Sequence, residues 1–276
     1  MYTVDLISIC IPTYNQTIHL NKLLISIYNQ KEVDFEVIIT DDSSNNDVKN
    51  LVDSFKKNGH IINYHKNNPA LGAPKNWNFG FRLAKGEYIK IMHHDQWFND
   101  DYALKKMKEK IKNDKNSFVF SAAKNIFQNK TSDFRLTTKD LHEIINEPEK
   151  LILANKIGGP TAILFRKEFN TFFDEKIIWL VDVEFYLQLL NKKFKLVYID
   201  ETLYTSMTDF DSLTNGNLLD SEKQLIEYSY LFNRYIKKLS FKKRVIYFLE
   251  IYKIIIIPLK SKYYLIQFLR LLKKII

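Results

Sequence analysis

The sequence predicts an α/β fold in which a mostly parallel sheet is flanked by helices and followed by a C-terminal helical region. Strand-like and helix-like segments alternate through the first hundred residues, a pattern that indicates βαβ crossovers. Residues 6–11 form an almost continuous apolar run rich in β-branched side chains, as expected of a strand covered on both faces. From Ser221 onward the chain is helical in character, apolar and basic.

The individual elements follow from the spacing of apolar residues. The strand candidates are short apolar runs, at residues 6–11, 35–40, 61–65, 87–92, 118–121, 161–165 and 196–199. The helix candidates carry apolar residues three and four positions apart, within residues 18–27, 48–55, 77–84 and 179–190. Residues 124–150 show no clear periodicity, and residues 205–217 are polar, so we expect irregular structure in both.

Size and composition narrow the class of protein. The 276 residues are 46% hydrophobic, which suits one large domain with an appendage. We expect a domain at residues 1–220, with halves at 1–100 and 101–220, and a separate region at 221–276. The net charge of +9 favours polyanions, an anionic membrane surface or phosphorylated ligands as partners.

Cys10 is the only cysteine, which excludes an internal disulfide and fits a reducing, cytosolic compartment. The N-terminus lacks the features of a signal peptide. We find no uninterrupted apolar stretch of the length that a membrane-spanning helix requires.

Polar clusters follow three of the predicted strands. They are residues 12–15, the pair Asp41 and Asp42, and residues 93–96. Ligands of open α/β sheets bind beyond the carboxyl ends of the strands. We therefore expect the ends of the second and fourth strands to lie side by side and to hold a nucleotide diphosphate with its metal ion.

The order and spacing of these motifs resemble those of the family 2 glycosyltransferases, which are inverting enzymes with a GT-A (Rossmann-like) fold. The resemblance covers about residues 4–214. The matching segments are ICIPTYN at 9–15, EVIITDDSS at 36–44, AKGEYI at 84–89, HHDQW at 93–97, GPTA at 159–162 and DVEFY at 182–186.

The resemblance implies a nucleotide site at the strand ends. Asp42 would hydrogen-bond the uracil ring of a UDP-sugar, and Asp41 would support its loop. The other candidates for this side of the site are Pro12, Thr13, Tyr14, Asn68, Asn78, His93 and His94.

The resemblance also implies two catalytic positions. Asp95 matches the metal-binding aspartate of the family's DxD signature, and Asp182 matches the catalytic base. The first acidic residue of the signature is replaced by His93. Histidine can bind a transition metal directly or through water, so His93 is a second candidate metal ligand. Gln96 stands where a further aspartate is common, and residues 208–214 lack the histidine or arginine found in some members.

The implied reaction passes a sugar to a hydroxyl of a glycan or lipid-linked acceptor, as in the assembly of polysaccharide, lipopolysaccharide or capsule. A Mn²⁺ or Mg²⁺ ion would neutralise the leaving diphosphate, because one carboxylate, diphosphate oxygens and water satisfy either ion. Asp182 would take the proton of the attacking hydroxyl. Attack from the face opposite the leaving group would invert the anomeric centre.

Each candidate also has a purely structural interpretation. Asp41 and Asp42 are good turn residues, and Asp182 is a good helix N-cap. His93 and His94 suit a polar sheet edge without a metal. Tryptophans such as Trp97 and Trp179 commonly pack in cores, and they can also stack on sugars. Arg166, after a predicted strand, suits a phosphate or a solvated surface equally.

The C-terminal residues 261–276 are basic and amphipathic. On a helical projection, most of their polar residues fall within an arc of about 140°. Such a helix can lie in an anionic membrane interface, which would place the protein on the inner face of the cell membrane. Alternatively, the apolar face packs on the catalytic domain or on a second subunit of a homo-oligomer. A nucleic-acid partner is disfavoured, because the basic residues alternate with long apolar ones.

Two other functions compete with the transferase. Loss of the first DxD carboxylate suits a catalytically weakened binding or scaffold subunit of a glycan-assembly complex. A nucleotidyltransferase would also use an α/β sheet and a metal, but the first strand is not followed by a glycine-rich, basic phosphate-binding loop.

Overall fold

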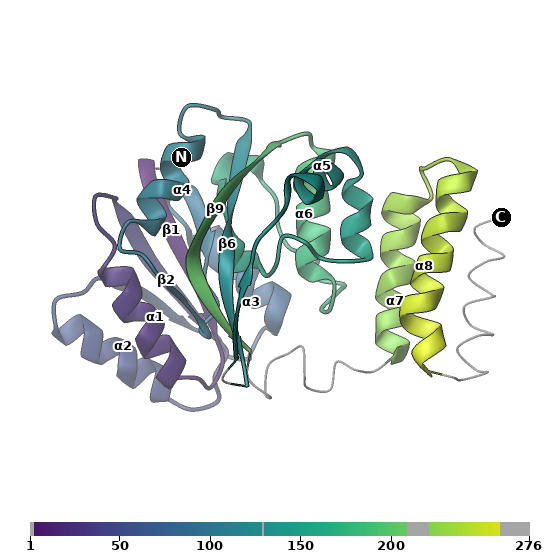
Figure 1. Ribbon diagram of the computed structural model, residues 1–276. Coiled ribbons are helices and arrows are strands. Elements are labelled where there is room, and N and C mark those ends of the chain that lie inside the picture. The colour runs from purple at the N-terminus through teal and green to yellow at the C-terminus, as the bar shows by residue number, and fades with distance from the viewer. Residues whose placement is uncertain (1–2, 129, 209–220, 260–276) are drawn as a thin grey trace.

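The computed structural model describes residues 3–128, 130–208 and 221–259, which form a sheet flanked by helices (Figure 1). Within these residues the sheet has nine strands in the order β3-β2-β1-β4-β8-β6-β9-β5, with β7 paired to β6. The strands are β1 (Thr3–Thr13), β2 (Phe35–Asp41), β3 (Ile62–Lys66), β4 (Gly86–Ile91), β5 (Gln96–Phe98), β6 (Ser117–Phe127), β7 (Lys130–Phe134), β8 (Ile163–Arg166) and β9 (Lys195–Thr208).

Helices connect the strands and continue the chain beyond the sheet. The α-helices are α1 (Ile18–Tyr28), α2 (Asp47–Lys57), α3 (Ala73–Leu83), α4 (Ala103–Ile111), α5 (Thr138–Asn146), α6 (Val181–Asn191), α7 (Ser221–Leu231) and α8 (Phe241–Leu259). Short 3-10 turns are η1 (Pro148–Ile152), η2 (Pro160–Ala162) and η3 (Lys167–Phe169), and η5 (Phe232–Ile236) is a π-helical turn.

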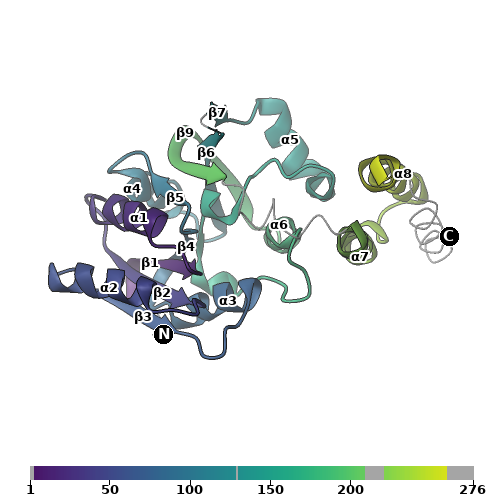
Figure 2. The ribbon, with the colours of Figure 1, turned by 90° about the horizontal axis from the view of Figure 1, so that it is seen from below.

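The central strand β1 explains the predicted α/β class. It pairs in parallel with β2 on one side and with β4 on the other. Its side chains alternate between two cores, because Ile9 and Ile11 pack with α1 and α2 while Cys10 packs with α3 and α6. Both faces are thus covered, as the apolar run at residues 6–11 predicts. Figure 2 shows α2 and α3 on opposite sides of β2.

Two glycines allow close approach in this half of the molecule. A Cβ at Gly80 in α3 would lie 3.2 Å from the Cβ of Cys10, so the helix backbone sits directly on β1. A Cβ at Gly86 would lie 2.5 Å from the Leu6 carbonyl oxygen. Only glycine fits there, where β4 begins beside β1.

The second half of the sheet differs from the prediction. Strand β8 runs antiparallel to both β4 and β6, so the sheet is mixed beyond β4. Residues 124–150, expected to be irregular, contain the end of β6, strand β7 and helix α5. The predicted loop at 205–217 is wrong at its start, because β9 continues to Thr208 and pairs along its length with β6. Cross-strand pairing supplies the order that the local sequence does not show.

The C-terminal helices pack on the sheet domain. Figures 1 and 2 show α6, α7 and α8 side by side. Leu231, Ile236 and Phe248 belong to the same buried cluster as residues of α3 and α6. Among the described helices, we find none that is both long and apolar enough to cross a membrane. The basic segment 261–276 lies outside the described residues.

Candidate functional site

Three strand ends bring the predicted polar clusters to one edge of the sheet. Thr13 at the end of β1 is in register with Asp41 at the end of β2. On the other side, the Met92 amide donates to the Cys10 carbonyl oxygen at 3.0 Å, which places His93 and the residues after it at the same edge. The expectation that the ends of β2 and β4 lie side by side is wrong, because β1 lies between these two strands. The nucleotide side of the candidate site is therefore centred on the end of β1.

Asp41 is fully buried and shapes the loop that follows β2. One carboxylate oxygen accepts the Ser43 amide at 2.8 Å, and the other accepts the Tyr64 hydroxyl at 2.7 Å and the Lys66 ammonium at 3.4 Å. Burial, together with the hydrogen bond to this carboxylate, raises the pKa of Tyr64. These contacts support the predicted role of Asp41 in holding its loop.

Asp42 holds a second loop against the strand ends. Its carboxylate accepts hydrogen bonds from the Asn67 amide group at 2.8 Å, the Leu71 amide at 3.0 Å and the Gly72 amide at 2.9 Å. Gly72 has a φ of 81°, which glycine adopts without strain. Because a carboxylate offers about four acceptor positions, Asp42 keeps room for one further donor, such as a ring N–H.

The other nucleotide-side candidates differ in their surroundings. Thr13 is buried, and its hydroxyl has no hydrogen-bond partner among the described residues. Tyr14 is 60% exposed beside it. Asn68 is exposed. Asn78 is buried, and its amide bonds the Phe173 backbone and Glu175, so its contact with a nucleotide stays a prediction.

Two histidines at the end of β4 are held in the neutral form. Burial, together with the neighbouring His94, lowers the pKa of His93 to about 3. Burial and the nearby His19 lower the pKa of His94 to about 4. A hydrogen bond to the Pro12 backbone opposes this shift by raising the pKa. The His93 ring packs 4.7 Å from the Trp77 ring. Within the described residues, its buried Nε2 atom has no hydrogen-bond partner, and a neutral imidazole nitrogen can bind a metal.

Asp95 lies between this histidine pair and β9, whose Met207 amide donates to the Asp95 carbonyl oxygen at 3.1 Å. In the described part of the chain, no three His, Cys, Asp or Glu side chains gather as a metal cluster. A Mg²⁺ or Mn²⁺ ion held by Asp95 and His93 would depend on substrate oxygens and water for its other ligands. Mg²⁺ sites in nucleotide enzymes are commonly built in this way.

Asp182 is the candidate base, in the first turn of α6. Burial raises the pKa of its carboxyl to about 6. Its Oδ1 atom accepts the Val183 amide at 2.8 Å, and its Oδ2 atom accepts the Asn155 side-chain amide at 2.8 Å. At pH 7 the carboxylate is mostly ionised, yet its pKa is close enough to neutrality for proton transfer.

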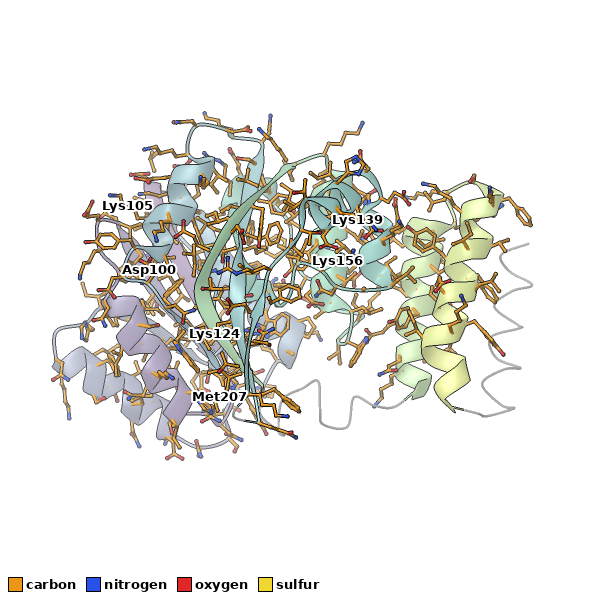
Figure 3. The ribbon with its side chains drawn as sticks, viewed as in Figure 1. Asp100, Lys105, Lys124, Lys139, Lys156 and Met207 are labelled. Carbon is orange, nitrogen blue, oxygen red and sulfur yellow. The ribbon has the colours of Figure 1, made fainter. Side chains whose placement is uncertain are left out.

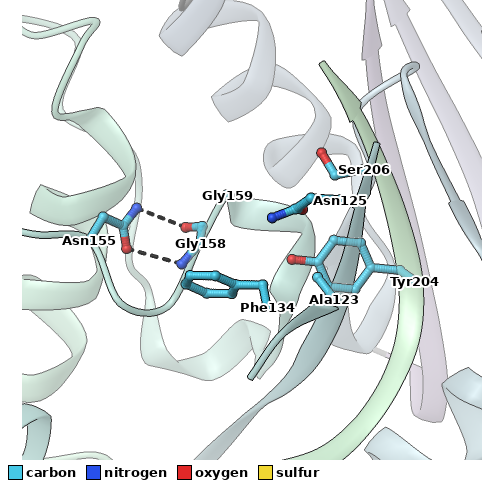
Figure 4. Close-up of a pocket in the computed structure, with 8 residues that line it drawn as sticks. All are labelled: Ala123, Asn125, Phe134, Asn155, Gly158, Gly159, Tyr204 and Ser206. Atoms are coloured by element: carbon cyan, nitrogen blue, oxygen red, sulfur yellow. Dashed lines mark hydrogen bonds between the residues drawn. The ribbon is translucent and has the colours of Figure 1, made fainter. Parts of the chain in front are cut away.

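A pocket of about 140 Å³ lies between the segment at Asn155, Gly158 and Gly159 and the strands β6 and β9 (Figure 4). Asn155 lines one side of the pocket, where it also bonds the Gly158 backbone. Tyr204 and Ser206 of β9 line the other side. Ser206 accepts a hydrogen bond from Gln96 at 3.1 Å. The pocket residue Asn155 is therefore bonded to the candidate base, and the pocket residue Ser206 is bonded to Gln96, the residue after Asp95.

Lys124 of β6 and Met207 of β9 lie toward the carboxyl ends of these two parallel strands (Figure 3). Because the Met207 amide donates to the Asp95 carbonyl oxygen, the end of β9 adjoins the residues that follow β4.

Several residues of the site have no local sequence signal. Asn155 lies between the expected irregular segment 124–150 and the predicted strand at 161–165, where no element is predicted, and Ser206 falls in an expected loop. Lys90 is different, since a lysine inside the apolar run 88–92 is visible in the sequence. It is fully buried, its pKa is lowered by burial to about 7, and its ammonium donates to the Thr161 and Ile163 carbonyl oxygens. Lys90 thereby holds the predicted acceptor-side segment 159–162.

Two structural interpretations are also settled. Arg166 is buried and pairs with Glu87 while donating to the Ile111 and Lys112 carbonyl oxygens, so it is neither solvated nor at the site edge. Trp97 is buried with the Lys22 ammonium 3.3 Å from its ring centroid, which identifies it as a packing residue.

Comparison with known proteins gives one family match. The model of glycosyl transferase family 2 matches residues 8–173. Over 90 residues, 32% of its length, the chain is 36% identical to the GalNAc(5)-diNAcBac-PP-undecaprenol beta-1,3-glucosyltransferase of Campylobacter jejuni. Over 255 residues, 83% of its length, it is 26% identical to the poly(ribitol-phosphate) beta-glucosyltransferase of Bacillus spizizenii. The aligned parts cover only 29% and 40% of these two relatives.

The fold resembles solved glycosyltransferases. Residues 1–349 of S. aureus TarS, solved in complex with UDP-GlcNAc, superimpose with a TM-score of 0.65 at 16% identity. The match covers 89% of this chain and 66% of that one. This similarity confirms the predicted GT-A fold, with a sheet of parallel strands extended by an antiparallel part.

Proposed function

Because the chain belongs to glycosyl transferase family 2, we propose that it moves a sugar from a UDP-sugar to a hydroxyl of a glycan or lipid-linked acceptor, with inversion at the anomeric carbon. The observation that carries the proposal is the pocket lined by Asn155 and Ser206, whose side chains bond Asp182 and Gln96 respectively. The Asp182 carboxyl, whose pKa is raised by burial to about 6, accepts a hydrogen bond from the pocket residue Asn155. The strand ends provide buried polar groups of the kind that bind a nucleotide.

Different residues of the chain would bind the nucleoside and the diphosphate of the donor. Asp42 and the Thr13 hydroxyl provide an acceptor and a donor for the nucleoside at the end of β1. Asp95 and His93 would hold a Mn²⁺ or Mg²⁺ ion, which when bound neutralises charge on the leaving diphosphate.

Asp182 would accept the proton of the acceptor hydroxyl while that oxygen bonds the anomeric carbon. The bond from this carbon to the diphosphate oxygen breaks at the same time, and UDP leaves with its electron pair. Asn155 keeps the Asp182 carboxylate oriented during the transfer, because its amide donates to Oδ2. General-base catalysis of this kind typically contributes 10²- to 10⁴-fold in rate.

The test is UDP or GDP release from UDP-glucose, UDP-galactose, UDP-GlcNAc and GDP-mannose, each with Mn²⁺ or Mg²⁺. We expect one donor to be hydrolysed slowly by the wild-type protein. Asp182→Asn should lose at least 10²-fold in this rate while its affinity for UDP, measured by calorimetry, stays within about twofold. Absence of turnover with every donor, despite UDP binding, would favour the scaffold alternative.

We also propose that α8 contacts an anionic membrane, which would bring the enzyme to a lipid-linked acceptor. Phe241, Val245, Ile246 and Leu249 are 38–59% exposed on one side of this helix. Lys242 and Lys253 fall on the same arc at about 100° per residue. Each basic residue near anionic lipid contributes about 1 kcal/mol to binding.

Co-sedimentation with vesicles tests this contact. We expect the full chain to bind phosphatidylglycerol vesicles in low salt and to bind phosphatidylcholine vesicles weakly. Ile246→Glu should weaken binding, and Ile61→Glu serves as the matched control, because Ile61 is 89% exposed beside the far edge strand β3. Equal binding of both variants would show that α8 is not the contact.

A further inference from the structure

Helix α7 carries an acidic residue that accepts hydrogen bonds from the segment directly before α6, the helix that contains the candidate base. Glu227 is buried, with 7% of its surface exposed. Its two carboxylate oxygens accept the backbone amides of Ile178, Trp179 and Leu180 at 2.8–3.1 Å. These are the three residues directly before α6, and α6 has no side-chain N-cap of its own.

This arrangement is stronger than a usual surface cap. The amide of Leu180, the N-cap residue, lacks a partner within the helix, and a buried carboxylate that accepts it together with the two preceding amides forms charge-assisted hydrogen bonds. Helix α6 also contacts η5, the turn that directly follows α7, where Glu184 accepts the Tyr235 hydroxyl at 2.7 Å. Figure 2 shows α7 directly beside α6. The position of the first turn of α6 therefore depends on α7.

Asp182 lies in this first turn, so its position follows from the same contacts. The Val183 amide, in the same turn, donates its hydrogen bond to the Asp182 carboxylate. Glu227 and Asp182 thus flank the start of α6 from the two sides, one on the segment before it and the other within it. Their negative charges also interact, since Glu227 adds to the rise in the pKa of Asp182.

We propose that Glu227 is a positioning residue for catalysis, which fixes the start of α6 so that Asp182 stays bonded to Asn155 beside the pocket. The inference rests on the proposed function, because it requires Asp182 to be the base. It assigns part of the active-site geometry to a helix beyond residues 8–173, the part matched by the family model. On this view the C-terminal helices are part of the catalytic unit.

The test compares Glu227→Gln, Glu227→Asp and Glu227→Ala in the full chain. Glu250→Gln is the matched control, because it removes one carboxylate of α8 that pairs with Lys253 on the same helix. Loss of the carboxylate in Glu227→Ala should lower kcat for the active donor about 10- to 100-fold, since a displacement of about 1 Å can cost 10²-fold. KM and the affinity for UDP should change less than about twofold. Glu227→Asp should recover part of kcat, and Glu250→Gln should match the wild type.

A pH profile separates positioning from folding. Removing the Glu227 charge in Glu227→Gln should move the acid limb of kcat to lower pH by on the order of half a pH unit, because a like charge disfavours ionisation of Asp182. Reduced folding alone would lower kcat in proportion to the folded fraction, measured by circular dichroism, without moving this limb.

A ¹³C NMR titration of the Asp182 carboxyl, assigned with Asp182→Asn, needs no substrate. Its midpoint should also fall in Glu227→Gln. An unmoved midpoint together with wild-type kcat in folded Glu227→Gln would overturn the inference. If no donor is turned over by the wild-type protein, the proposed function fails, whereas the NMR midpoint still decides whether Glu227 acts on Asp182.

Discussion

Replacing Asp182 by Asn should stabilise the protein at pH 7 while it removes activity. The reason lies in the raised pKa of this carboxyl, which moves from an ordinary value of 3.8 to about 6 because the group is buried. Holding the ionised form in the folded state therefore costs free energy at neutral pH. A rise of about two pH units corresponds to at most ~3 kcal/mol, at 1.36 kcal/mol per pH unit.

The sign follows from proton binding. Between pH 3.8 and 6 the folded state keeps the proton on Asp182 and the unfolded state has released it, so the stability contributed by this proton falls as pH rises. Above pH 6 the cost is constant. The asparagine variant has no such proton, although it loses part of the contacts with Asn155 and Val183. We therefore expect a net gain of about 1–2 kcal/mol at pH 7.

The assay is urea unfolding of wild type and Asp182→Asn at pH 7 and pH 5. The advantage of the variant should fall by about 1.3 kcal/mol at pH 5 and nearly disappear, because the wild-type carboxyl is then mostly protonated. Asp101→Asn serves as the control, since it removes an exposed carboxylate that pairs with Lys31. A variant that is less stable than the wild type at pH 7, or an advantage that does not change with pH, would contradict the burial of an ionised Asp182.

Three further predictions test other parts of the site. Gly86→Ala should lower the free energy of unfolding by about 1–3 kcal/mol, seen as a lower urea midpoint, because its Cβ would lie 2.5 Å from the Leu6 carbonyl oxygen. Asp95→Asn should raise the Mn²⁺ concentration needed for half-maximal donor hydrolysis, and an unchanged metal dependence would remove Asp95 from the ligands. Asp42→Ala should weaken UDP binding in calorimetry and release the loop at Gly72, detected as faster amide exchange at Leu71.

Much of the first half of the fold is visible in local sequence. The apolar run at residues 6–11 predicts a strand covered on both faces, and β1 has α1 on one side and α3 on the other. Short-range periodicity succeeds here because parallel strands are buried on both faces along their length. The polar clusters of residues 12–15, Asp41–Asp42 and 93–96 mark one edge for the same reason, since parallel strands end together.

The second half resists such prediction. Strand β7 is polar and largely exposed, and the last part of β9 is mostly polar and only partly buried, so no apolar pattern marks them. They are strands because they pair with β6. Such a strand is held by backbone hydrogen bonds to its neighbour. The residues of the strand itself do not identify that neighbour.

The family and its chemistry are thus readable from motifs whose residues are close in the chain, because each motif is one strand end and its turn. The surroundings of Asp182 are not. Asn155 reaches it across 27 positions, and Glu227 reaches the start of its helix across 47. Contacts of this kind arise only when packing brings distant segments together, and the pKa of Asp182 follows from that packing rather than from its neighbours in the chain.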